Sequence, residues 1–433
     1  MIQLQRFRFA ALFCVVGLLT VPLGLSFGDD EVKSQSSGEK AANVENAAEG
    51  EKAASDDKPA ANAPDTEKSA EDSEVKDPTE EWNELSKRKI EIAQKLQKFQ
   101  GEFKLPDTTE DRKKEIRDEF TRLVREYNIE IRARMGELAE AVYQADSKNV
   151  EAGEVVMESA YGEGQYQQAL DVAKNLIESG GKSKYAGSLA INIAGAASFS
   201  LNQFKEAADY LKKAEDDNQL SDIYGQQFVE HLPAMLELWN KEQEIRSRES
   251  KLEGDEQLPM VELTIGNDEK ELGKVVLKLF EDEAPNAVAN FISIVENKDA
   301  EQNYNGVKFH RVLPNFMAQT GNLEASGKKP LDYTIECECY KPNARKHFRG
   351  SLSMALKGRD TGDSQFFITH MPTYWLNEEV RPEFVHTVFG RVVSGMDVID
   401  RTKQGDKITS AIVQFKRPHE YKPTKVPNKK PGS

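Results

Sequence analysis

The sequence predicts two folded regions of different class, an all-α helical region over residues 81–250 followed by a β-rich region. In the first region, apolar residues recur at mixed three- and four-residue steps, which is the spacing of amphipathic helices. In the second, Val261, Leu263 and Ile265 alternate with polar residues, which is the period of a strand with one buried face. A polar stretch at 249–258 separates the two patterns, so we place the domain boundary there.

Composition excludes several classes of function. The 433 residues carry a formal net charge of −16, and an acidic balance of this size argues against a nucleic-acid-binding protein, whose binding surface is basic. A mean hydropathy of −0.65 excludes a polytopic membrane protein. Three cysteines are too few for a scaffold built from disulfides.

The first 28 residues have the pattern of a targeting segment. Arg6 and Arg8 precede an apolar stretch at 9–27, and Asp29 follows it. A basic start, an apolar middle and a small-residue exit are typical of a secretory signal peptide. The stretch is also long enough for an uncleaved membrane anchor. Both alternatives place the rest of the chain outside the cytoplasm, in the periplasm or cell envelope or secreted, with the membrane contacted only through this segment.

Residues 29–80 predict a disordered acidic linker. The segment holds 16 acidic residues and 6 lysines, but no aromatic residue and no Leu, Ile or Met. A segment of this composition cannot bury enough apolar surface to fold. We therefore expect it to act as a tether between the N-terminal segment and the folded regions.

Two long helices are predicted at the start of the helical region. A break at 105–107 separates them, and Asp107 or Thr109 is the expected N-cap of the second helix, with Glu110 and Asp111 in its first turn. The apolar pattern of this second helix continues toward residue 143. The pair is expected to form an antiparallel hairpin.

An internal repeat follows these helices. Tyr166 and Phe204 lie 38 residues apart, as do Ala169 and Ala207. An aromatic residue near a turn and small residues at helix contacts resemble tetratricopeptide (TPR) repeats, whose period is about 34 residues. An ordinary helical bundle is the alternative. In both cases we expect this region to offer a surface to a protein partner.

Four segments of the β-rich region combine large apolar side chains, turn-forming residues and a few polar groups. They are 309–322, 350–370, 373–376 and 384–392. They contain no glycine-rich phosphate loop, no carboxylate pair at a spacing suited to acid–base work, and no serine in a nucleophile elbow. The pattern predicts an apolar pocket with a few polar orienting groups.

These four segments, with residues 261–291 before them, closely resemble cyclophilin-type peptidyl-prolyl cis–trans isomerases. The resemblance implies an isomerase domain at 257–418, followed by a basic flexible tail at 419–433. It implies an eight-stranded antiparallel β-barrel closed by two helices, one beginning at Pro285 and the other at Met396. It also implies proline-containing peptides or unfolded proteins as substrates, with no cofactor and no metal.

By motif position, the resemblance implies that Arg311 is the catalytic arginine, assisted by Gln319 and Phe316. Gln319 is expected to hydrogen-bond the substrate backbone and to help hold Arg311. The remaining residues are expected to bind substrate, either as walls and rim of a proline pocket or, for the alanine, along the substrate backbone. They are Met317, Ala355, Phe367, Trp375, Leu376 and His386.

Three departures from the family pattern stand near this site. Leu356 occupies a position where many members have Asn, and Thr320 and Asn322 replace common Gly and Asp. The segment 377–385 is about six residues longer than in compact members. Nearby, Cys337, Cys339 and His347 form an incomplete metal-ligand set. Reduced or structural cysteines are the expectation there, with a disulfide or a metal site as the alternatives.

The predicted function is isomerisation of X–Pro bonds in exported proteins, by non-covalent stabilisation of the twisted amide. Arg311 is expected to donate hydrogen bonds beside the apolar pocket that holds the prolyl ring. The alternative is a non-catalytic proline-binding module whose helical region carries the protein–protein interaction.

Overall fold

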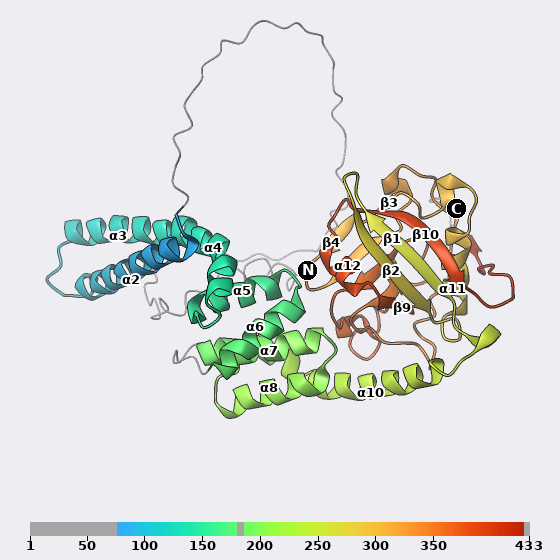
Figure 1. Cartoon of the computed structure of the whole chain (residues 1–433), viewed down its shortest axis with the longest axis horizontal. Coiled ribbons are helices and arrows are strands. Elements are labelled where there is room, and N and C mark those ends of the chain that lie inside the picture. Colours follow the sequence, from blue (N-terminus) through green and yellow to red (C-terminus); the bar gives the residue numbers. More distant parts are fainter. Residues whose placement is uncertain (1–75, 180–185, 428–433) are drawn as a thin grey trace, which may run out of the picture. The chain divides into compact units, whose positions relative to one another are not determined.

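The computed structural model describes residues 76–179 and 186–427 (Figure 1). The predicted signal segment and nearly all of the predicted acidic linker lie outside the described residues. Helices occupy 78–249, and an antiparallel sheet follows, which confirms the predicted order of fold classes. Within the described ranges, every helix is too short or too polar to cross a membrane.

The helical region begins with a long hairpin. Its elements are α2 (Pro78–Phe103), α3 (Glu110–Arg125), the π-helical turn η2 (Glu126–Ile131) and α4 (Arg132–Ala145). The side chain of Thr109 accepts a hydrogen bond from the Arg112 amide at 3.3 Å, so Thr109 is the N-cap of α3, one of the two caps predicted. Trp82, Ile92, Leu96 and Phe99 form the buried face of α2.

Two helix pairs then repeat the same geometry. They consist of α5 (Val150–Gly162), α6 (Tyr166–Glu178), α7 (Ala186–Ser200) and α8 (Phe204–Asp216). Each pair turns on a left-handed residue, Gly164 with φ 80° and Asn202 with φ 64°. The amides of Gln165 and Gln203 close equivalent turns, each with a hydrogen bond of 2.8 Å. The offset of 38 residues found in the sequence is therefore a structural repeat.

Two further helices, α9 (Gln226–Val229) and α10 (Leu232–Glu249), complete the helical region. Buried ion pairs join α10 to the β-rich region. Arg345 Nη2 lies 2.7 Å from Glu242 Oε1, and its Nη1 lies 2.7 Å from Glu249 Oε1. The guanidinium also lies 3.7 Å from the centre of the Phe280 ring. These ion pairs join the helical region to the β-rich region. Separating the regions would leave buried charges unpaired, which lowers the stability of the fold.

The β-rich region is one curled antiparallel sheet (Figure 1). Its strand order is β3-β10-β1-β2-β9-β7-β8-β5-β4. In chain order the strands are β1 (Met260–Gly266), β2 (Glu271–Leu279), β3 (Val307–Lys308), β4 (Arg311–Leu313), β5 (Met317–Thr320), β7 (Ser351–Met354), β8 (Phe366–Thr369), β9 (Val388–Ser394) and β10 (Lys407–Phe415). Only two residues separate β3 from β4, the strands at opposite edges. β3 and β4 can be counted as one bent strand that connects the two edges of the sheet. With that count, the sheet has the predicted eight strands in the described part of the chain. A separate two-stranded ladder pairs β6 (Tyr333–Thr334) with β11 (Val426–Pro427).

Two helices accompany the sheet, α11 (Pro285–Val295) and α12 (Met396–Arg401), and both begin where the sequence predicted. Phe291 of α11 packs edge-on against Phe366 of β8, with ring centres 5.2 Å apart. The Glu338 carboxylate accepts hydrogen bonds from the Asn286 and Ala287 amides at 3.2 and 2.9 Å. A negative charge at this helix N-terminus stabilises α11 on the sheet.

Candidate active site

Three adjacent strands align three of the predicted site residues in one row. Arg311 of β4 pairs with Gln319 of β5, and Gln319 pairs with Phe367 of β8. Residues directly opposite one another in a sheet share a face, so these side chains lie on the same surface. Gly321 keeps β5 against β8, because a Cβ there would collide with the Ser364 carbonyl oxygen.

The opposite face of the same strands belongs to the main core. Phe366 is buried in that core, whereas Phe367 belongs to a separate apolar cluster on the site face. Adjacent strand residues point to opposite sides of a sheet, and this alternation predicted the division correctly.

The separate cluster forms the walls of a pocket. Met317, Phe367 and Leu376 are buried in it, and Phe316, Trp375, Ala355 and Leu313 pack against them half-buried. The Phe316 ring centre lies 6.5 Å from that of Phe367 and 5.8 Å from that of Trp375. The structure thus brings together every residue that the resemblance assigned to the pocket walls, although they come from separate segments.

Arg311 stands at the edge of this apolar cluster with its guanidinium exposed. Its carbon Cζ lies 5.8 Å from the centre of the Phe316 ring, and Nη1 donates a 3.5 Å hydrogen bond to Gln319 Oε1. Gln319 Nε2 in turn donates to Gln365 Oε1 at 3.3 Å. The remaining guanidinium N–H groups can donate to a molecule in the pocket.

Gln365 is a site residue that sequence reasoning missed. It holds Gln319 from the side opposite Arg311, and its carbonyl oxygen accepts a hydrogen bond from the Ala355 amide at 3.0 Å. The signal was present, because Gln365 precedes Phe367 by two residues and so shares its face of the chain.

His386 packs against Phe367 at the rim of the pocket. Its ring centre is 5.3 Å from that of Phe367, and Nδ1 lies 2.9 Å from the Met354 carbonyl oxygen. Burial lowers the pKa of His386 below its ordinary value, so the imidazole is neutral at pH 7. Because a carbonyl oxygen only accepts, Nδ1 carries the proton and donates.

His347 supports the pocket from behind. Its ring stacks parallel to Phe367 with centres 6.2 Å apart. Nδ1 lies 2.8 Å from Asn377 Oδ1, and Nε2 lies 3.0 Å from the Ser353 hydroxyl. Burial lowers the pKa of His347 to about 3, which keeps the ring neutral. Sequence reasoning considered His347 only as a metal ligand, but among the described residues no group of three metal-binding side chains is assembled.

The helical region also reaches this rim. The Tyr374 ring, next to Trp375 in the chain, lies 4.1 Å from the ring of His231 and 6.2 Å from that of Phe199, measured between centres. Tyr374 and Trp375 pack edge-on at 5.1 Å. Helical residues therefore back the wall of the pocket, which no pattern in the sequence indicated.

The longer segment at 377–385 forms a surface loop beside the rim. It begins at the buried Asn377 and ends at the buried Val385, one residue before His386. Between them, Val380 and Phe384 expose 42% and 58% of their surface. The insertion thus adds apolar surface next to the pocket instead of covering the pocket walls.

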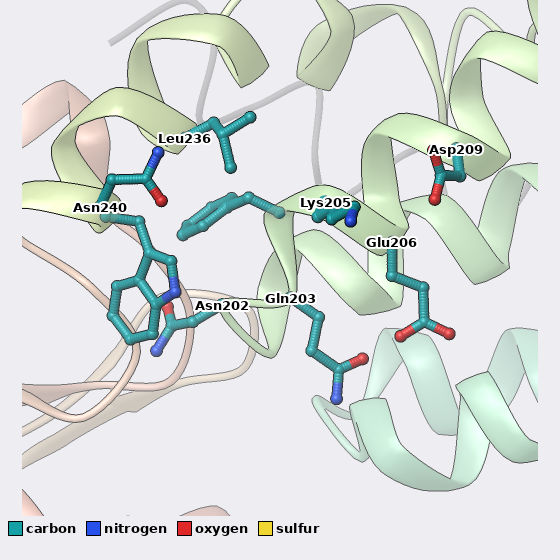
Figure 2. Close-up of a pocket in the computed structure, with 9 residues that line it drawn as sticks. Asn202, Gln203, Lys205, Glu206, Asp209, Leu236 and Asn240 are labelled. Atoms are coloured by element: carbon teal, nitrogen blue, oxygen red, sulfur yellow. The ribbon is translucent and has the colours of Figure 1, made fainter. Parts of the chain in front are cut away.

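A second hollow, of about 600 Å³, lies in the helical region (Figure 2). Leu236, Trp239 and Asn240 of α10 face the first turn of α8 across it. On the opposite side it is lined by Asn202, Gln203, Phe204, Lys205, Glu206 and Asp209. The lining of this hollow thus combines apolar groups, side-chain amides and charged side chains.

Comparison with known proteins identifies the family of the β-rich region. A family model described as cyclophilin type peptidyl-prolyl cis-trans isomerase/CLD matches residues 260–420, while no tetratricopeptide family model matches the helical region. A peptidyl-prolyl cis-trans isomerase of Helicobacter pylori is 43% identical over 143 residues, which cover 32% of this chain and 80% of the relative. Peptidyl-prolyl cis-trans isomerase B of Bacillus subtilis is 40% identical over 141 residues, covering 33% and 91%.

Proposed function

The chain belongs to the cyclophilin-type peptidyl-prolyl cis–trans isomerases, and we propose that it acts on X–Pro bonds of unfolded proteins outside the cytoplasm. The single observation that carries a catalytic role for the site is the exposed Arg311 guanidinium beside the pocket of Met317, Phe367 and Leu376. The basic and apolar N-terminal pattern supports action on exported proteins.

The reaction needs no covalent intermediate. Partial double-bond character gives the peptide bond a rotation barrier of about 18–20 kcal/mol, whereas cis and trans X–Pro differ by only about 0.5–1 kcal/mol. A catalyst must therefore favour the twisted amide over both planar forms. In our proposal the apolar pocket holds the prolyl ring while the preceding carbonyl rotates.

Arg311 then acts on the twisted state. As conjugation is lost, the prolyl nitrogen gains lone-pair character and becomes a better acceptor, so donation from the guanidinium is strongest at the top of the barrier. Gln319 Oε1 accepts a 3.5 Å hydrogen bond from Arg311 Nη1, and Gln319 Nε2 donates a hydrogen bond to Gln365. This chain of hydrogen bonds orients the guanidinium without using all of its donors.

A proline-isomerisation assay on the full chain with a short Ala-Pro peptide tests this role. We expect Arg311→Ala to lower kcat/KM by about 10²–10³-fold, the usual effect of removing one transition-state donor. Arg311→Lys should recover only part of the loss, because an ammonium lacks the planar fork of donors. Arg401→Ala, which removes an exposed arginine of α12, is the matched control and should keep the wild-type rate. Equal rates for Arg311→Ala and wild type would contradict the mechanism and favour a binding module.

Export is tested separately. Residues 1–28 fused to a reporter that is active only outside the cytoplasm should yield activity, and replacing residues 9–27 with polar residues should abolish it. The mass of the purified native protein distinguishes cleavage from anchoring. A full-length protein recovered from the soluble cytoplasmic fraction would overturn the proposed location.

We further propose that the hollow between α8 and α10 binds an extended segment of the unfolded client. Leu236 offers an apolar contact there, and Asn240 offers an amide to the peptide backbone (Figure 2). Leu236→Asp should weaken suppression of aggregation of an unfolded protein while leaving isomerisation of a short peptide unchanged. Suppression equal to wild type would exclude this surface.

A further inference from the structure

Cys337 and Cys339 stand on either side of Glu338, whose side chain is directed away from them. Glu338 is directed to the N-terminus of α11, where its two carboxylate oxygens accept the Asn286 and Ala287 amides. Neither cysteine is in a disulfide, and each thiol shifts the pKa of the other. The contacts of Glu338 therefore fix the chain so that the two sulfur atoms share one side.

The surroundings of the two sulfur atoms differ. Cys337 is half-buried, and its Sγ accepts a 3.1 Å hydrogen bond from the Asp360 amide. Asp360 Oδ1 also accepts the Cys337 amide at 2.8 Å, and Asp360 holds this turn in the left-handed region at φ 61°. Cys339 is buried, with Sγ 3.7 Å from the Val385 carbonyl oxygen.

These contacts give the two thiols different reactivity. The hydrogen bond from Cys339 and the Asp360 amide lower the pKa of Cys337, whereas sharing its proton with Cys337 and burial raise the pKa of Cys339. A thiolate is the attacking species in thiol–disulfide exchange, so Cys337 is the attacking group and Cys339 the resolving group.

We propose that Cys337 and Cys339 form a redox-active dithiol that exchanges with the disulfide of a small thiol compound. The Cys337 thiolate attacks one sulfur of the disulfide, the S–S bond of the small compound breaks, and a mixed disulfide forms. The first thiolate leaves and takes up, through solvent, the proton that Cys337 lost. Cys339 then attacks the Cys337 sulfur, and its proton goes to the second leaving thiolate. The protein loses two electrons as its new S–S bond forms, and the small disulfide is reduced to two thiols.

Chain geometry permits this ring closure. Residues two apart have Cα atoms at most about 7 Å from each other. Disulfides usually span about 4.4–6.8 Å between Cα atoms, so a modest bend of the chain is sufficient. The position is also close to the peptide site, because Val385, whose carbonyl oxygen lies 3.7 Å from Cys339 Sγ, precedes His386 of the rim.

The test uses glutathione disulfide and the full chain with Cys14→Ser, so that only the two thiols of interest remain. After reaction, intact-mass measurement should show the loss of two hydrogen atoms and no retained glutathione. Cys339→Ser should instead retain one glutathione on Cys337, because the resolving thiol is missing. Cys337→Ser should react at least about tenfold more slowly.

Isomerase activity on a short Ala-Pro peptide serves as the folding control, since neither cysteine belongs to the catalytic machinery. A second measurement needs no variant of the pair: iodoacetamide should label Cys337 at least about tenfold faster than Cys339. Retention of glutathione by the intact pair, or equal labelling of the two thiols, would overturn the proposal. Either result leaves the isomerase mechanism untouched.

Discussion

Tyr166 and Asn315 are joined by a hydrogen bond of 2.7 Å from the tyrosine hydroxyl to Oδ1, although 149 residues separate them in the chain. Asn315 Nδ2 donates in return to the Gly162 carbonyl oxygen at 3.1 Å. Asn315 has a φ of 58° and precedes Phe316, so the turn that carries a pocket wall is held by the helical repeat. The helical region is thus part of the structure that positions the site.

We expect Tyr166→Phe to lower kcat/KM for a short Ala-Pro peptide by about two- to twelvefold, because one hydrogen bond contributes about 0.5–1.5 kcal/mol. The effect should fall mainly on KM, since in our proposal Phe316 binds the prolyl ring and does not act on the reacting nitrogen. Steady-state kinetics of Tyr166→Phe beside Tyr210→Phe, a half-buried tyrosine of α8, makes the comparison. An unchanged KM in both Tyr166→Phe and Asn315→Gly would show that this contact does not position Phe316.

Sequence patterns correctly predicted the features that depend only on neighbouring residues. Strand alternation separated Phe366 from Phe367, and the capping pattern included Thr109, because both follow from the positions of neighbouring residues. The family motif predicted that Arg311 and the pocket residues share one site, although periodicity alone does not show which strands pair.

The contacts that were missed depend on residues far apart in the chain. His347 binds Asn377 and Ser353 only after β7 and the insertion have been placed around it. Tyr166 contacts Asn315 because the repeat packs on the β4–β5 turn. Neither contact could be predicted from the spacing of residues in the sequence, because the partners lie at no fixed distance from each other along the chain.

Arg345 is expected to hold the two regions together. Its side chain is 2% exposed and lies against Glu242, Glu249 and Glu283. Arg345→Met would leave buried carboxylates short of a partner, so we expect a loss of about 3–5 kcal/mol of unfolding free energy. Urea unfolding should show this loss, whereas the exposed Arg248→Ala should change stability by less than about 0.5 kcal/mol. A stability near wild type in Arg345→Met would mean that apolar packing, not charge pairing, holds α10.

His347 is expected to make stability depend on pH. Its folded pKa of about 3 lies below its unfolded value of about 6.5, so the unfolded chain binds one more proton between these values. Stability from this residue is complete above about pH 6.5 and falls by roughly 1.4 kcal/mol per pH unit as the pH decreases. Urea unfolding of wild type and His347→Gln between pH 7.5 and 5 isolates the effect, because all other titrating groups are common to both. Parallel pH profiles would show that His347 titrates alike in both states.

The insertion at 377–385 is expected to bind the part of a long substrate that lies outside the proline pocket. Val380 and Phe384 are exposed beside His386, and covering such side chains with a bound chain contributes up to about 1.5–3 kcal/mol each. Because both are only partly exposed, we expect Val380→Ser with Phe384→Ser to raise KM for an unfolded protein substrate about three- to tenfold. A short Ala-Pro peptide does not reach the loop, so its kcat/KM should stay at the wild-type value. Ile412→Ser is the matched control, because Ile412 is 55% exposed but lies on β10. A KM for the unfolded protein that changes equally in the control and in the loop variant would show that general surface hydrophobicity, not the insertion, binds the substrate.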